Sequence, residues 1–221
     1  MKSPHPPSED RRRRAEEILK RLDTLYPDAR CSLNYQNPFQ LLVATVLSAQ
    51  CTDERVNKVT PTFFRQFPTP QAVAQAPVED IEKLIHAAGL YRNKARNIQK
   101  ACQILVDRHG GSVPVTLEDL VQLPGVGRKS AAVILGNAFG VPALPVDTHV
   151  ARVSRRLGLA DGTDPLHIER DLCALFPRQS WVRLSHQLIQ HGRRVCRARQ
   201  PLCGDCALQS LCDFFQAAPP S

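Results

Sequence analysis

The sequence predicts an all-α fold, and three observations lead to this prediction. Apolar residues recur every three or four positions over most of the chain, which is the period of one face of an α-helix. Residues that cap helix N-termini precede these segments, some with proline next to them, and glycines follow them. No convincing pair of segments alternates apolar and polar residues as hairpin strands would. The 221 residues are enough for one or two domains with a buried core.

The first predicted helices follow residues that can accept a backbone hydrogen bond, namely Ser8, Asn37, Thr52 and Thr69. The helix after Ser8 has an apolar stripe that includes Ala15, Ile18 and Leu22, and we expect its outer face, Arg11 to Arg14, to be solvated. The apolar run Phe39–Leu47 also fits a buried strand, but its length and the preceding Asn37-Pro38 favour a helix.

The later helices are delimited mainly by proline and glycine. We expect the helix after Thr52 to break or kink near Pro61. Segments 80–88, 91–108 and 128–138 are predicted helices that end before glycines. Asp147, Thr116 and the Asp164-Pro165 pair begin further helices, and a last one over 180–191 is expected to end at Gly192.

Composition and charge narrow the class of partner. The formal net charge is +8, and arginine is far commoner than lysine, which is typical of proteins that bind a polyanion such as nucleic acid. Aromatic residues make up only 5% of the chain, which argues against a protein that binds single strands by stacking. No segment is long and apolar enough for a membrane span, and the polar N-terminal residues do not resemble a secretory signal. We therefore expect a cytoplasmic protein that does not bind membranes.

Four of the eight cysteines lie close together near the C-terminus, with the spacing C-x6-C-x2-C-x5-C: Cys196, Cys203, Cys206 and Cys212. Four thiolates in so short a stretch predict a metal centre, either zinc or an iron–sulfur cluster. Zinc sites with four cysteines usually contain two short C-x2-C pairs, and only one is present here, so the spacing slightly favours the cluster. The arginines around them, including Arg197 and Arg199, either offset the thiolate charge or contact phosphates. The other four cysteines, Cys31, Cys51, Cys102 and Cys173, are expected to be small buried residues.

The segment Leu123 to Lys129, LPGVGRK, predicts a tight turn between two helices. Gly125 and Gly127 allow the backbone to turn sharply there, because glycine has no side chain that would clash. The N-terminus of the second helix offers unpaired N–H groups to a phosphate. Lys129 lies in its first turn, where the helix dipole and the charge of Arg128 favour a neutral, nucleophilic amine. The alternative is a lysine that binds phosphate. On these residues alone, the phosphate-binding interpretation is the stronger of the two.

Asp147, in the segment VDTHV, also has two interpretations. An aspartate directly before a helical apolar stripe is a good N-cap. If its helix lies beside the one that carries Lys129, the same carboxylate can assist proton transfer or stabilise a cationic sugar.

Together, LPGVGRK, VDTHV and the four-cysteine tail resemble the endonuclease III family, the helix–hairpin–helix DNA glycosylases with an iron–sulfur cluster. The segments LLVATVLSAQCTDERVNKV and GLYRNKARNI are similar to an early helix and a later loop of that family, so the resemblance covers residues 12 to 214. Cys51 departs from the alanine common at its position.

The resemblance implies a two-lobed all-α fold with DNA in the groove between the lobes. Residues 30–142 would form a six-helix barrel with the hairpin, residues 9–29 and 143–221 a cluster domain, and residues 1–8 a disordered lead. It implies a 4Fe-4S cluster on the four tail cysteines, Lys129 as the nucleophile and Asp147 as the catalytic carboxylate. The residues expected to bind DNA are Gln50, Leu90, Gly125, Gly127, Arg128, Arg197 and Arg199, of which Gln50 fills the gap left by an extruded nucleotide and Leu90 wedges into the stack.

The resemblance implies a bifunctional DNA glycosylase and abasic-site lyase of base excision repair. The expected partner is double-stranded DNA with damaged bases or abasic sites. The bases that the enzyme removes would be oxidised pyrimidines, and the enzyme would be a monomer. One alternative is a monofunctional mismatch or adenine glycosylase of the same fold, whose members lack the lysine found at position 129. The other is a non-catalytic DNA-binding or redox-sensing iron–sulfur module, which would not need Lys129 and Asp147 together.

Overall fold

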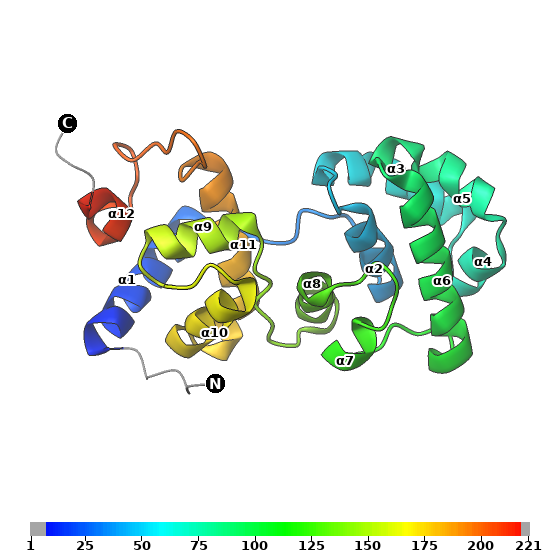
Figure 1. The fold of residues 1–221 in the computed structure, drawn as a ribbon, viewed down its shortest axis with the longest axis horizontal. Helices are drawn as coiled ribbons and strands as arrows, with labels where there is room; N and C mark the ends of the chain where they lie inside the picture. Colours follow the sequence, from blue (N-terminus) through cyan, green and yellow to red (C-terminus); the bar gives the residue numbers. More distant parts are fainter. Residues whose placement is uncertain (1–7, 218–221) are drawn as a thin grey trace. The chain divides into compact units, whose positions relative to one another are not determined.

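The computed structural model describes residues 8–217, and every regular element in that range is a helix (Figure 1). The all-α prediction is confirmed. The chain divides into two compact units, one made of Met1–Arg30 with Pro142–Ser221 and the other of Cys31–Val141. We call them the terminal unit and the central unit. None of the helices within residues 8–217 is both long and apolar enough to cross a membrane.

The central unit is built around α2, a helix that is buried along nearly its whole length. Helices α3, α6 and α8 pack against α2, and α4 and α5 pack along α6 (Figure 1). Its helices are α2 (Pro38–Leu47), α3 (Asp53–Gln66), α4 (Pro70–Gln75), α5 (Val78–Ile85), the 3-10 turn η1 (His86–Ala88), α6 (Tyr91–His109), α7 (Leu117–Leu120) and α8 (Arg128–Phe139). A helix as apolar as α2 is stable only where other helices cover most of its surface.

The terminal unit joins the first helix to the last ones around a second apolar core. Helix α11 packs against α9 and α1, and α10 packs against α9. The core includes Ile18 and Leu22 of α1, Val150 of α9 and Leu188 of α11. Its elements are α1 (Glu9–Leu25), α9 (Thr148–Arg156), α10 (Pro165–Leu175), the 3-10 turns η2 (Arg178–Ser180) and η3 (Gln209–Leu211), α11 (Trp181–Arg194) and α12 (Asp213–Gln216).

The helix starts follow the capping residues of the sequence. The side chain of Asn37 accepts from the backbone N–H of Gln40, at 2.9 Å, and Pro38 is the first residue of α2. Ser8, Thr52, Thr69, Thr116, Asp147 and Asp164 cap their helices in the same way. Residues 1–7 of the expected disordered lead lie outside the described residues.

Helix α3 runs through Pro61, so the break expected there is wrong. Proline inside a helix removes one hydrogen bond and costs about 3 kcal/mol. Here its ring lies on the exposed side, while Val56, Val59 and Phe63 are buried on the other side of the same helix. Burial of each such side chain contributes about 1.5–3 kcal/mol, which outweighs the cost.

The arginine run of α1 is not a uniformly solvated face. Arg11 pairs with Asp161 at 3.1 Å, and Arg14 pairs with Asp213 and donates to the carbonyl of Gly158 at 3.2 Å. Only Arg12 and Arg13 are exposed. Arg11 and Arg14 are three residues apart, so they share one side of the helix next to its buried stripe.

Gly192 does not end α11, which continues to Arg194. A Cβ atom at Gly192 would lie 3.1 Å from the Cβ of His149 and 3.2 Å from Nη2 of Arg152. The carbonyl of Gly192 accepts from that same nitrogen at 2.9 Å. The glycine therefore allows α9 and α11 to approach closely and is not a helix stop.

We expect Gly192→Ala to lower the free energy of unfolding by about 1–2 kcal/mol. The added methyl group overpacks the contact between α9 and α11, which costs about 1–3 kcal/mol. This cost exceeds the roughly 0.5–1 kcal/mol that alanine gains over glycine inside a helix. Gly204→Ala is the matched control, since no heavy atom lies within 4 Å of its added Cβ. Thermal unfolding of both variants measures the difference. Equal midpoints would show that the close approach at Gly192 contributes nothing to stability.

Candidate functional site

The glycine hairpin of the central unit links α7 to α8. Val126 donates to the carbonyl of Leu123 at 3.0 Å, which closes the turn. Gly125 has φ +83°, and a Cβ there would lie 3.1 Å from Cγ1 of Val46 and 3.2 Å from Cβ of Asn97. Glycine is required at position 125 both by its conformation and by the space around it.

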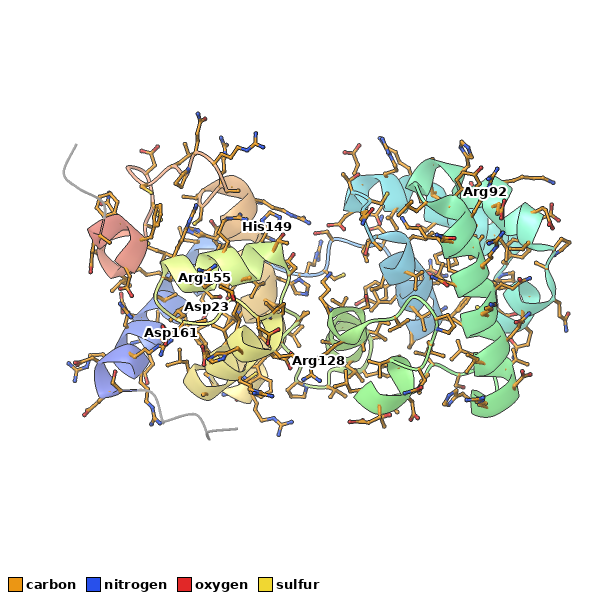
Figure 2. All side chains as sticks on the ribbon, in the orientation of Figure 1. Asp23, Arg92, Arg128, His149, Arg155 and Asp161 are labelled. Carbon is orange, nitrogen blue, oxygen red and sulfur yellow. The ribbon has the colours of Figure 1, made fainter. Side chains whose placement is uncertain are left out.

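Gly127 is the N-cap of α8 and has extended backbone, with φ −86° and ψ 174°. Gly127 has no side chain that could cap this helix, and an uncapped helix N-terminus suits an anion. Arg128 and Lys129 follow directly and are both exposed (Figure 2 labels Arg128). The hairpin thus leads into a helix N-terminus that is followed by two exposed basic residues.

Lys129 lies near the thiol of Cys31. Burial raises the pKa of this thiol, a backbone hydrogen bond from Leu33 lowers it, Asp53 raises it and Lys129 lowers it. Both charged groups therefore lie close enough to act on one sulfur atom. The sequence did not mark Asp53, which is in the first turn of α3.

Two loops of the central unit have strained backbone. Gln50, with φ 51°, and Leu90, with φ 45°, are the non-glycine residues with positive φ within residues 8–217. Such conformations cost about 1–3 kcal/mol each and occur mostly at functional sites. Both side chains are exposed, that of Leu90 by 58%, so burial of these side chains does not explain the strain.

Asp147, in the terminal unit, is the N-cap of α9. Its Oδ1 accepts from the backbone N–H groups of His149 and Val150, both at 2.8 Å, so the capping interpretation is confirmed. Burial lowers the pKa of the neighbouring His149, and the charge of Asp147 opposes that shift (Figure 2 labels His149). The bonds to the first turn of α9 fix the half-buried carboxylate in one orientation.

The four tail cysteines line one pocket of the terminal unit, together with Arg156, His191 and several apolar side chains. Burial raises the pKa values of Cys206 and Cys212, and the charges of the other tail cysteines raise them further. Within residues 8–217, no group of three or more His, Cys, Asp or Glu residues has the arrangement of a single-ion site.

Two arginines of α9 hold the cysteine loop through its backbone. Nη1 of Arg156 donates to the carbonyl of Arg197 at 2.7 Å and to Sγ of Cys196 at 3.4 Å. Nε of Arg152 donates to the carbonyl of Cys196 at 3.0 Å. The side chains of Arg197 and Arg199 themselves are exposed.

His191 connects the same pocket to α1. Burial lowers its pKa to about 4, so the ring is neutral at pH 7. Its Nδ1 lies 3.0 Å from the hydroxyl of Tyr26, and its Nε2 lies 3.7 Å from Sγ of Cys206. When the hydroxyl donates to Nδ1, the ring proton is on Nε2 and faces the sulfur.

The remaining cysteines differ in burial. Cys102 is fully buried, as expected, and burial raises its pKa to about 12. Cys31, Cys51 and Cys173 are only partly buried, so that expectation is wrong for them. Cys31 and Cys51 lie outside the helices, in the segments before α2 and α3.

Comparison with known proteins decides the family. Residues 43–178 match the family described as HhH-GPD superfamily base excision DNA repair protein. Endonuclease III of Synechocystis sp. is 56% identical over 209 residues, covering 94% of this chain and 95% of that protein. Endonuclease III of Escherichia coli K12 is 44% identical over 198 residues, covering 90% and 94%.

The chain belongs to the endonuclease III family.

Solved structures agree with this family. A trapped endonuclease III–DNA covalent intermediate, an estranged-adenine complex, has a TM-score of 0.88 at 46% identity and covers 93% of this chain and 97% of its own. A thermostable thymine-DNA glycosylase has a TM-score of 0.84 at 22% identity, which supports the fold alone. The predicted family and enzyme class are confirmed: the chain is a DNA glycosylase and lyase of base excision repair.

The residues expected from the endonuclease III resemblance fall into both units. The central unit holds Gln50, Leu90, Gly125, Gly127, Arg128 and Lys129, and the terminal unit holds Asp147, Arg197, Arg199 and the four tail cysteines. Sequence reasoning missed Lys94, Arg152 and Arg156. A signal for Lys94 exists, because it lies in line with the buried stripe of α6, four residues before Ile98.

We expect Leu90→Gly to raise the free energy of unfolding by about 1 kcal/mol. Glycine relieves about 1–3 kcal/mol of strain, and its greater backbone entropy when unfolded costs about 0.5–1 kcal/mol. Val115→Gly is the matched control, because Val115 is 55% exposed and lacks positive φ. Chemical denaturation compares the two; a loss of stability in both variants would contradict strain at Leu90.

Proposed function

We propose that this chain removes oxidised pyrimidines from double-stranded DNA and then cleaves the abasic strand by β-elimination through Lys129. The observation that carries the proposal is the exposed Lys129 in the first turn of α8, directly after the glycine hairpin. A relative of 46% identity has been trapped as a covalent intermediate with DNA, which supports an enzymatic nucleophile in this family.

The proposed reaction begins with attack of the Lys129 amine on C1′ of the damaged nucleotide. The new C–N bond forms as the glycosidic bond breaks, and the base leaves with that electron pair and takes up a proton. The substituted nitrogen then loses one proton, and its lone pair forms a C=N bond to C1′ as the C1′–O4′ bond breaks. O4′ takes up a proton, and the product is a protonated imine. The imine acidifies the C2′ proton; its removal breaks the C3′–O bond, and water then releases the lysine.

Asp147 is proposed as the carboxylate that accepts a proton from the lysine or stabilises positive charge on the sugar. Its orientation supports this role, because two backbone N–H groups at the start of α9 hold it in place. A positioned carboxylate contributes about 10²–10⁴-fold through proton transfer.

Gln50 and Leu90 are proposed to open the duplex. A damaged base is poorly paired or stacked, so its extrusion costs less free energy than that of a normal base. Leu90 would wedge into the stack, and Gln50 would fill the gap. The strained backbone of both residues supports this role, since both carry exposed side chains on loops of the central unit.

The four tail cysteines are proposed to hold a 4Fe-4S cluster. In such a cluster each thiolate binds a different iron atom, so the thiolates surround a pocket, as these four do. The guanidinium N–H of Arg156 that faces Cys196 suits a metal-bound thiolate. A bound cluster supplies a structural staple, since four cysteine ligands leave no open position for hydrolytic chemistry.

The remaining proposals concern DNA contacts and organisation. Gly125, Gly127 and Arg128 would bind phosphate at the start of α8, and Arg197 and Arg199 would do so from the cysteine loop. Residues 30–142 would be the barrel and residues 9–29 with 143–221 the cluster domain. We also propose that the enzyme acts as a monomer.

Borohydride trapping on abasic duplex DNA tests the function. The wild type should form a stable crosslink and cut the strand without added divalent metal. Lys129→Gln keeps the approximate length but removes the amine, so the crosslink should vanish and base release should fall by about 10³-fold or more. The control, Lys100→Gln, removes another exposed lysine of the central unit and should still trap.

Asp147→Asn separates the carboxylate's two roles. Asparagine caps a helix about as well as aspartate, so the unfolding midpoint should stay nearly unchanged while base release slows. Full activity of this variant would make Asp147 a cap alone. Base release by the wild type without any crosslink would favour a monofunctional glycosylase, and the absence of both would favour a binding module.

Iron analysis tests the proposed cluster. The purified protein should be brown and hold about four irons per chain. Cys203→Ala removes one ligand and should lower both the iron content and the yield of folded protein, whereas Cys102→Ala, on α6 of the central unit, should keep the iron. A colourless protein with one zinc per chain would overturn the cluster assignment.

A further inference from the structure

Lys94, on α6, is a buried charged residue to which the proposed reaction gives no role. Its side chain is 5% exposed, and its Nζ donates to the carbonyls of Leu47 and Ala88, both at 2.8 Å. Burial lowers the pKa of Lys94, and the nearby charge of Cys51 raises it. A buried ammonium group is costly unless hydrogen bonds compensate for the lost water, and these two carbonyls provide them.

The two carbonyls belong to the ends of two helical segments. Leu47 is the last residue of α2, and Ala88 is the last residue of η1. Carbonyls at helix C-termini lack intrahelical partners and carry the negative end of the helix dipole. One ammonium group has three donors, so Lys94 acts as a common cap for both ends.

Each capped end leads into one of the strained loops. Gln50 follows Leu47 by three residues, and Leu90 follows Ala88 by two. Lys94 also donates its own backbone N–H to the carbonyl of Leu90 at 3.1 Å. Residues with positive φ persist only where the surrounding structure fixes the backbone. Lys94 bonds to the backbone at Leu90 itself and, on the other side, at Leu47, three residues before Gln50.

We propose that Lys94 is a positioning residue that holds the Gln50 and Leu90 loops at a fixed separation, so that both side chains enter the duplex together. This inference rests on the proposed function of the two loops. Lys94 does not contact DNA itself, because its ammonium group is buried and bonded to backbone. Its role is therefore in base extrusion and not in the chemistry at Lys129.

Lys94→Met removes the donors and keeps an unbranched apolar side chain. Base release from a paired oxidised pyrimidine should fall about 10-fold or more, because the loops no longer act together. Borohydride trapping at an abasic site in single-stranded DNA needs no extrusion and should stay within about twofold of the wild type. Equal losses in the two assays would overturn the proposal.

A double-mutant cycle with Leu90→Ala tests whether Lys94 acts through the loops. In the Leu90→Ala background, Lys94→Met should cost little further base release, because the wedge that it positions is already gone. Full additivity of the two losses would show that Lys94 acts elsewhere and would overturn the proposal. Ile98→Val, a buried change one turn further along α6, controls for general destabilisation and should leave the ratio of the two assays unchanged.

Hydrogen exchange provides a readout without activity. In Lys94→Met, amide exchange should rise in both segments 48–51 and 86–90 and stay unchanged in α8. Lys94→Gln, which retains one N–H donor group, replaces the methionine variant if that variant does not fold; if neither folds, Lys94 holds the whole central unit and the proposal fails. If the wild type neither releases bases nor traps, the proposed function fails, and the exchange experiment alone decides the role of Lys94.

Discussion

The unpaired backbone groups at helix ends are the constraint on which this structure depends. Every helix begins with N–H groups and ends with carbonyls that have no partner within the helix. In a chain made of many short helices such ends are frequent, and several of the residues proposed to have functional roles are found there. Lys129 lies in the first turn of α8, Asp147 caps α9, and Lys94 caps the ends of α2 and η1.

The helix starts were predictable because capping is local. A side chain such as Asn37 or Thr116 bonds to an amide within three residues, so the sequence alone contains both partners. The course of the chain at Pro61 and Gly192 was not predictable. Both residues usually interrupt a helix, and whether they do depends on which distant side chains pack around them.

The residues of the candidate site also differ in whether the sequence alone could identify them. Lys129, Asp147 and the four cysteines stand in compact motifs whose residues are near each other in sequence. Lys94, by contrast, bonds to a carbonyl 47 residues away, and Arg156 bonds to carbonyls 41 and 42 residues away. Backbone carbonyls have no sequence signature, so a side chain whose partners are distant carbonyls appears in the sequence as an ordinary basic residue. Only the folded structure shows which carbonyls such a side chain binds.

Helix α9 contacts both the carboxylate of Asp147 and the cysteine loop. Its first turn fixes the carboxylate of Asp147, and Arg152 and Arg156 in its later turns hold the backbone of the cysteine loop. At 1.5 Å per residue, the nine steps from Asp147 to Arg156 span about 14 Å. A helix of this length is a stiff rod, so its two ends shift together. The carboxylate proposed to act in base release and the loop proposed to hold the cluster therefore share one short helix as their support.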